Sequence, residues 1–240
     1  MNIKIVHMLF NPEFQADIPD EKWQSVLEKQ RRSIESFEKI KHKFKSYTQL
    51  YSDVNRTELP RETCGDPSIV REDITGVTGP VLSYGHYGAY KAHRRAATQE
   101  FSDEVDALII LESDVVTDLS AEDFYNIVKE SYEFGIQNDA RLITFAEPKF
   151  GMVGYNLDEH IIQIEKWKKI PHFLMGSMYM VFRSEKESIK NKYETAKWMT
   201  PDVWLFWNYD RRVNIFCLQN PIVYQVGGFS MIDLKTKDRM

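Results

Sequence analysis

The segment 105–116, VDALIILESDVV, decides the fold class. Its first seven residues form the clearest apolar run in the chain, which predicts a strand buried on both faces of a sheet. The run ends abruptly at Glu112-Ser113-Asp114, so two carboxylates directly follow a buried strand. In sheets of parallel strands, ligands bind beyond the carboxyl ends of the strands. The segment therefore predicts an α/β protein with these acids at the ligand-binding edge.

Strands and helices alternate in the first half of the chain. Apolar runs predict strands at 3–10, 47–51 and 141–146. Helices are expected at about 20–40, at 83–101 and after Ser120, which can cap the first turn. Later strands are expected at 161–167, 178–182, 213–218 and 222–226, with a helix at about 184–198. We therefore predict a single domain, 1–240, with a mostly parallel sheet flanked by helices and a more strand-rich C-terminal half.

Composition limits the class of protein. An apolar fraction of 42% and an aromatic fraction of 13% are sufficient for a packed core. The net charge of −5 argues against broad binding to nucleic acid, although a local basic patch could still bind it. Cys64 and Cys217 are too few for a disulfide framework or a cysteine-ligated zinc site, which favours a reducing, cytoplasmic setting. No segment approaches the ~20 apolar residues that a transmembrane helix needs.

Glu112 and Asp114 are candidate metal ligands. Side chains two residues apart on an extended chain face the same way, so both carboxylates could approach one ion. Their oxygens suit Mn²⁺ or Mg²⁺, and such an ion can bridge the oxygens of a diphosphate. The alternative is that the two acids only end a strand and solvate a turn.

The segment 79–96, GPVLSYGHYGAYKAHRRA, is a second candidate. Its three glycines allow the backbone to approach a ligand closely. A helix that begins near Ser83 would point its amides at an anion, and Lys91 adds positive charge. We therefore place His86, Tyr87 and Lys91 at a site for an anionic ligand. The alternative is that the tyrosines pack, the histidines find local partners and the basic residues form a solvated face.

Two later segments could complete a site. Gly176 and Ser177 precede the strand expected at 178–182. Asp202 follows Pro201 in a stretch rich in aromatic residues. An acid in such surroundings could have a raised pKa and act as a general base. The alternative is that Pro201-Asp202 opens a helix and that the aromatic residues belong to the core.

The order of these segments resembles the glycosyltransferases of family 25, the lipooligosaccharide and procollagen sugar transferases, and related GT-A enzymes. In that family a helix carrying Gly and Ser-His precedes a strand that ends in Glu-Asp-Asp-Val. A glycine-containing strand, a Pro-Val-Asp element and a Pro-x-x-x-Gln segment near a Ser follow. Here LIILESDVV, GSMYMVF, PDVW and PIVYQVGGFS occur in that order, within Gly79 to Asp233. The resemblance implies a GT-A, Rossmann-like fold, with a nucleotide-sugar half at about 1–118 and an acceptor half at about 119–240.

The resemblance also implies roles for single residues. Asp114 matches the acid that holds the metal, and Glu112 matches the acid that begins the DxD-like triplet. Asp202 matches the acid of the Pro-Val-Asp element and is our predicted catalytic base. Two features depart from the family: Ser113 replaces the middle acid, and HYGAYKAH differs from the usual Gly-Cys-x-x-Ser-His. The residues expected near the donor are His86, Tyr87, Lys91, Glu112, Gly176, Ser177, Gln225 and Ser230.

The function implied by the resemblance is metal-dependent sugar transfer from a nucleotide-sugar, a UDP-sugar, to a hydroxyl acceptor, with Mn²⁺ or Mg²⁺ as cofactor. The acceptor is expected to be a glycan, and a hydroxymethylated base in phage DNA is a second option. For DNA, Arg31, Arg32 and the lysines at 39, 41, 43 and 45 could contact phosphates. The alternative from another class is a non-catalytic module that binds a nucleotide or glycan on the same fold, which the loss of the middle acid favours.

Overall fold

The structure is a computed structural model that describes residues 1–13, 20–53, 84–147, 162–170, 177–195, 214–230 and 235–237. None of the helices in these ranges is long and apolar enough to cross a membrane. The helices are α1 (Asp20–Glu38), α2 (Tyr84–Gln99), α3 (Ala121–Gln137) and α4 (Lys186–Thr195). The strands are β1 (Ile3–Leu9), β2 (Ser46–Tyr51), β3 (Ala107–Leu111), β4 (Val115–Val116), β5 (Ala140–Thr144), β6 (Ile162–Ile164), β7 (Trp167–Ile170), β8 (Met178–Phe182), β9 (Asn214–Leu218), β10 (Tyr224–Gln225), β11 (Gly228–Ser230) and β12 (Lys235–Lys237).

Eight strands form one sheet in the order β2-β1-β3-β8-β5-β9-β7-β6. Strand β1 pairs in parallel with β2 and β3, and β5 pairs in parallel with β9. Strand β8 runs antiparallel to β3 and β5, and β7 runs antiparallel to β9 and β6. Six of the eight strands therefore point the same way, which confirms the predicted α/β fold with a mostly parallel strand direction. Strands β5 to β12 all follow α3, so the C-terminal half is the strand-rich one.

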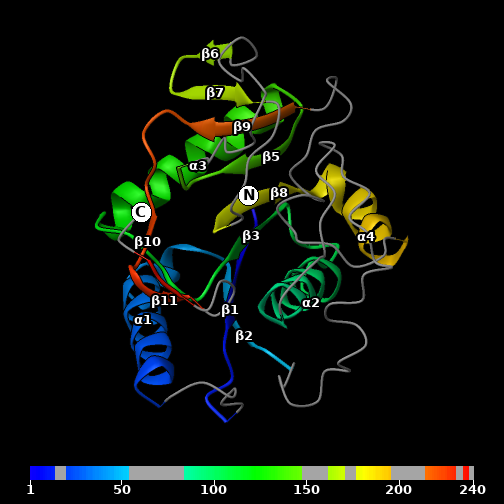
Figure 1. Ribbon diagram of the computed structural model, residues 1–240. Coiled ribbons are helices and arrows are strands. Elements are labelled where there is room, and N and C mark those ends of the chain that lie inside the picture. Colours follow the sequence, from blue (N-terminus) through cyan, green and yellow to red (C-terminus); the bar gives the residue numbers. More distant parts are fainter. Residues whose placement is uncertain are drawn as a thin grey trace, which may run out of the picture.

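Helices cover both faces of the sheet: α1 and α3 lie on one face, and α2 and α4 lie on the other (Figure 1). Alternate side chains of the strands feed two separate cores. On β3, Ile109 and Leu111 pack in the core that includes Phe37 of α1 and Phe124 of α3. Ile110 of the same strand packs in the core that includes residues of α2 and α4. Strand β3 is thus buried on both faces, as its continuous apolar run predicts.

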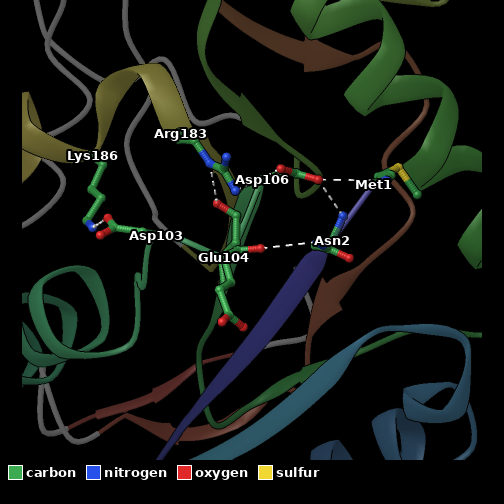
Figure 2. Close-up of polar contacts among 8 residues, drawn as sticks. Met1, Asn2, Asp103, Glu104, Asp106, Arg183 and Lys186 are labelled. Carbon is green, nitrogen blue, oxygen red and sulfur yellow. Dashed lines mark hydrogen bonds and ion pairs between the residues drawn. The ribbon is translucent and has the colours of Figure 1, made fainter.

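A group of polar contacts lies at the amino end of β3 (Figure 2). The acidic segment follows the other end of this strand. Asp106, directly before β3, accepts a hydrogen bond from the backbone N–H of Asn2 at 2.7 Å and lies 3.7 Å from the amino group of Met1. The Arg183 guanidinium, just after β8, contacts Asp106 at 2.9 Å and donates to the Val105 carbonyl at 3.0 Å. Side chains therefore reinforce the sheet hydrogen bonds that hold β3 between β1 and β8, which fixes where the acidic segment emerges.

The predicted cap of the third helix is confirmed. The Ser120 hydroxyl accepts a hydrogen bond from the backbone N–H of Asp123 at 3.1 Å and so satisfies one of the free amides in the first turn of α3. The helix start predicted near Ser83 lies outside the described residues.

The single strand predicted at 161–167 is wrong, because the chain reverses there into the hairpin β6–β7. Glu165 has a φ of 49° in the turn between the two strands. The reversal buries Trp167, whose ring stacks on that of Phe134 with 4.1 Å between centroids. Burial of this tryptophan outweighs the local preference for a continuous strand. The run at 222–226 forms only the short β10.

Candidate functional site

Glu112 directly precedes a turn at the carboxyl end of β3, and Asp114 lies in that turn. The backbone N–H of Glu112 donates to the Ser177 carbonyl at 2.9 Å, and that of Val115 donates back to Glu112 at 3.4 Å. The two acids follow the buried strand into a turn, as expected, but the chain is not extended between them, so the predicted reason for their closeness does not hold. The turn still brings them together, because Gln225 Nε2 lies 3.2 Å from Glu112 Oε2 and 3.3 Å from Asp114 Oδ1. A single amide thus contacts both carboxylates.

Gln225 reaches the acids through a short two-stranded ladder. Strand β10 pairs antiparallel with β4, with Gln225 opposite Val115. The backbone N–H of Val226 donates to the Asp114 carbonyl at 2.8 Å, which extends the pairing by one residue. The ladder brings the Gln225 side chain to Asp114, 111 positions away in the chain, and places its amide over the carboxyl end of β3.

Lys29 of α1 is a site residue that sequence reasoning missed. Its Nζ lies 3.4 Å from Asp114 Oδ2, and the residue is only 8% exposed. Helical periodicity could have identified it, because Lys29 lies three residues after Val26 and four before Ser33, both of which are buried. A lysine on the buried stripe of an amphipathic helix needs a partner or a ligand.

His93 of α2 belongs to the candidate segment 79–96, but its contact with Glu112 was not predicted. Its Nε2 lies 3.3 Å from Glu112 Oε1, and its Nδ1 lies 2.8 Å from the Tyr179 hydroxyl. The imidazole is 1% exposed and stacks on the Tyr179 ring, with 5.7 Å between centroids and 11° between the planes. Glu112 is therefore held from the α2 face of the sheet, and Asp114 is contacted from the α1 face.

The electrostatics of the site suit a cation. Burial raises the pKa of the Asp114 carboxyl group. The Lys29 ammonium offsets part of this rise, and the negative charge of Glu112 adds to it. Two carboxylates at one place disfavour each other's charged forms, and a cation between them would remove that cost.

The donor set fits Mn²⁺ or Mg²⁺. The two carboxylates supply hard oxygens that approach a common point, and a half-turn of the Gln225 amide would present its oxygen there in place of its nitrogen. In the described ranges, no group of three or more His, Cys, Asp or Glu side chains is placed to hold a metal ion. Any remaining coordination positions would fall to water or to a bound ligand.

Of the other predicted site residues, the structure describes some fully, some without their side chains and some not at all. His86, Tyr87 and Lys91 lie in the first half of α2, and Lys91 is partly exposed. Ser177 begins the β8 segment beside Glu112, and its buried hydroxyl has no hydrogen-bond partner in the described part of the chain. The side chains of His86, Tyr87 and Ser230, and the whole of Gly176 and Asp202, lie outside the described residues.

No protein-family model and no curated protein matches the chain. Among solved structures, it is similar to a glycosyltransferase involved in the glycosylation of the major capsid of PBCV-1, with 13% identity, a TM-score of 0.37 and coverage of 81% of this chain and 66% of that one. It is also similar to mannose-6-phosphate isomerase from Helicobacter pylori, with 11% identity, a TM-score of 0.43 and coverage of 91% and 98%. For the apo form of mouse xyloside xylosyltransferase 1, the identity is 10%, the TM-score 0.35 and the coverage 81% and 71%. The chain thus spans about two thirds of the PBCV-1 enzyme. Because the three TM-scores are below 0.5, the fold is assigned from the strand order and strand directions of the chain itself.

Proposed function

We propose that the chain is a metal-dependent glycosyltransferase that moves a sugar from a nucleotide-sugar, a UDP-sugar, to a hydroxyl acceptor. The observation that carries the proposal is the convergence of Glu112 and Asp114 on the single amide of Gln225 at the carboxyl end of β3. This is the sheet edge where α/β proteins bind ligands. The motif order that resembles family 25 supplies the reaction class.

Glu112, Asp114 and the amide oxygen of Gln225 would hold Mn²⁺ or Mg²⁺. The bound ion would stabilise the negative charge of the departing diphosphate. The amino end of α2, with His86, Tyr87 and Lys91, would bind the donor, since helix amides favour anions. Gly176 and Ser177, whose buried hydroxyl has no hydrogen-bond partner among the described residues, would complete the donor site beside Glu112.

Asp202 is the proposed general base. In an inverting transfer its carboxylate takes the proton of the acceptor hydroxyl as the acceptor oxygen bonds to the anomeric carbon. The bond between that carbon and the diphosphate oxygen breaks, and the diphosphate leaves with the electron pair. Asp202→Asn would therefore lower transfer by roughly 10²–10⁴-fold while donor binding survives.

A glycan is the favoured acceptor. Several basic residues that a DNA acceptor would need are already paired: Arg31 with Glu28 and Glu35, Lys41 with Glu38 and Lys43 with Glu122. These ion pairs neutralise the positive face that phosphate binding requires.

Hydrolysis and transfer of UDP-sugars, measured with and without Mn²⁺, test the proposal. The wild-type protein should turn over a donor only with the metal, and Asp114→Asn should abolish this turnover. Asp103→Asn, a change at a surface acid whose side chain is 96% exposed, is the matched control and should behave as wild type. Donor binding without turnover would favour the non-catalytic module, and Mn²⁺-dependent turnover unchanged in Asp114→Asn would refute the metal site.

A further inference from the structure

Among the described residues, the buried Lys29 ammonium uses only part of its hydrogen-bonding capacity. It carries three N–H donors, and in the described part of the chain its one acceptor is Asp114, at the long distance of 3.4 Å. Removing a lysine from water is costly, and one long contact with a carboxylate repays little of that cost. The side chain is therefore poorly explained as a structural ion pair alone.

The helix that carries Lys29 is firmly positioned over the site. Next to Lys29, the Gln30 side chain accepts from the backbone N–H of Phe10 at 2.6 Å and donates to the Phe10 carbonyl at 3.1 Å. Two turns further on, Ser36 donates to the Thr117 carbonyl at 3.1 Å and accepts from the Thr117 N–H at 3.0 Å. These contacts fix α1 against the ends of β1 and β4, so the Lys29 ammonium is held in place before any ligand arrives.

The charge balance of the site indicates a role for the Lys29 ammonium. Glu112 and Asp114 together carry two negative charges when ionised, and one divalent cation would cancel them. Lys29 is then the remaining positive charge of this cluster, next to Asp114. The diphosphate of a nucleotide-sugar carries two negative charges. An ammonium that can donate hydrogen bonds attracts such an anion more strongly than a neutral metal–carboxylate cluster does.

We infer that Lys29 binds the diphosphate of the donor beside the metal and stays with that diphosphate as it leaves. This inference rests on the proposed function and adds to it a donor-binding residue from α1, on the face of the sheet opposite α2. In the free protein Asp114 positions the Lys29 ammonium. In the complex the ammonium contacts both Asp114 and the diphosphate.

The test compares Lys29→Met, Lys29→Arg and the control Lys129→Met. Lys129 is the matched control because it also pairs with a carboxylate, Glu133 at 3.9 Å, but on the surface of α3. Calorimetry with saturating Mn²⁺ measures binding of UDP and of uridine, which lacks the diphosphate. Electron paramagnetic resonance of free Mn²⁺ measures metal affinity separately, and thermal unfolding checks that each variant folds. Lys29→Gln replaces Lys29→Met if the latter does not fold.

We expect Lys29→Met to weaken UDP binding by about tenfold or more, the size expected for a charge-assisted hydrogen bond, with uridine and Mn²⁺ binding unchanged. Lys29→Arg should keep most of the UDP affinity, and Lys129→Met should match wild type. Unchanged UDP binding in Lys29→Met, or a parallel loss of Mn²⁺ binding, would overturn the inference. A wild-type protein that binds Mn²⁺ but no UDP would instead contradict the proposed function itself.

Discussion

His93 Nε2 lies 3.3 Å from Glu112 Oε1, which joins α2 to the carboxyl end of β3 through a buried histidine–carboxylate contact. The opposite ring nitrogen is held by the Tyr179 hydroxyl at 2.8 Å, so the imidazole is fixed at both ends. A carboxylate held in this way loses little freedom when it binds a metal. His93 is thus a positioning residue for Glu112.

The first prediction concerns His93→Phe, which keeps the ring over Tyr179 and removes both nitrogen contacts. Mn²⁺ affinity should fall by about 10- to 100-fold, as for other partners that orient a ligand side chain. His93→Gln keeps an N–H donor and should recover part of the affinity. Mn²⁺ titration by electron paramagnetic resonance measures both variants. If His93→Phe binds Mn²⁺ as tightly as wild type does, the histidine only packs against Tyr179 and does not position Glu112.

The second prediction uses Gln225, whose amide touches both carboxylates. Gln225→Glu adds a third negative charge, so the metal-free protein should unfold at a lower temperature and Mn²⁺ should raise that temperature by more than in wild type. Gln225→Met removes the amide and should weaken the Mn²⁺ effect. Thermal unfolding at several Mn²⁺ concentrations checks both. A smaller Mn²⁺ effect in Gln225→Glu than in wild type would exclude residue 225 from the metal site.

The sequence predicts the framework of this fold well because the framework depends on local patterns. The run of apolar residues in β3 requires burial on both faces, and Ser120 marks a helix start by its own side chain. The acids after β3 follow from the same pattern, since the end of a buried strand defines the ligand edge.

The rest of the site depends on pairings between distant parts of the chain. Lys29 meets Asp114 across 85 positions, and His93 meets Glu112 across 19. The sequence around Lys29 does not predict its contact with Asp114. Helical periodicity predicts only that Lys29 is buried, which is uncommon for a lysine. The hairpin at Glu165 was missed for a similar reason, because Trp167 is buried against Phe134 of a distant helix.

The third prediction concerns the pH dependence of stability. His7 is fully buried between the Tyr47 hydroxyl at 2.7 Å and the Ser33 hydroxyl at 3.0 Å, and burial lowers its pKa to about 3. In the unfolded chain the pKa of the histidine is near 6.5. At a pH between about 3 and 6.5, the unfolded state therefore binds a proton at His7 that the folded state does not bind. The free energy of unfolding should therefore fall as pH drops below 6.5, by about 1.4 kcal/mol per pH unit from this residue.

Urea unfolding between about pH 4.5 and pH 6.5, within the interval between the two pKa values, tests the assignment. His7→Gln should flatten the curve, and His42→Gln, a change at an exposed histidine, should leave the wild-type slope. Parallel pH curves for wild type and His7→Gln would show that His7 is not the group responsible.

The fourth prediction is a steric one at Gly135 of α3. A Cβ added there would lie 2.1 Å from Cζ of Phe182, a fully buried ring that stacks on Tyr132. Gly135→Ala should therefore lower the free energy of unfolding by about 1–3 kcal/mol, despite the better helix propensity of alanine. The smaller side chain in Gly135→Ala/Phe182→Leu should remove the clash, so the cost of the alanine should shrink in that background. An unchanged urea midpoint in the single variant would contradict the packing.

The last prediction concerns Gly88 of α2, where the opposite holds. In the described structure a Cβ added at Gly88 would meet no atom within 4 Å, so packing does not require a glycine there. Alanine favours a helix interior over glycine by about 0.5–1 kcal/mol, and Gly88→Ala should raise the free energy of unfolding by that amount. If the glycine instead lets the helix backbone approach the donor, as we propose for the amino end of α2, the same methyl group should weaken UDP binding. Urea unfolding and calorimetry with UDP and Mn²⁺ on one preparation separate the two effects. A more stable variant with weaker UDP binding would place the donor against α2. A more stable variant with unchanged UDP binding would make this part of α2 a scaffold, and the donor would then have to be held by Lys29 and the acidic turn.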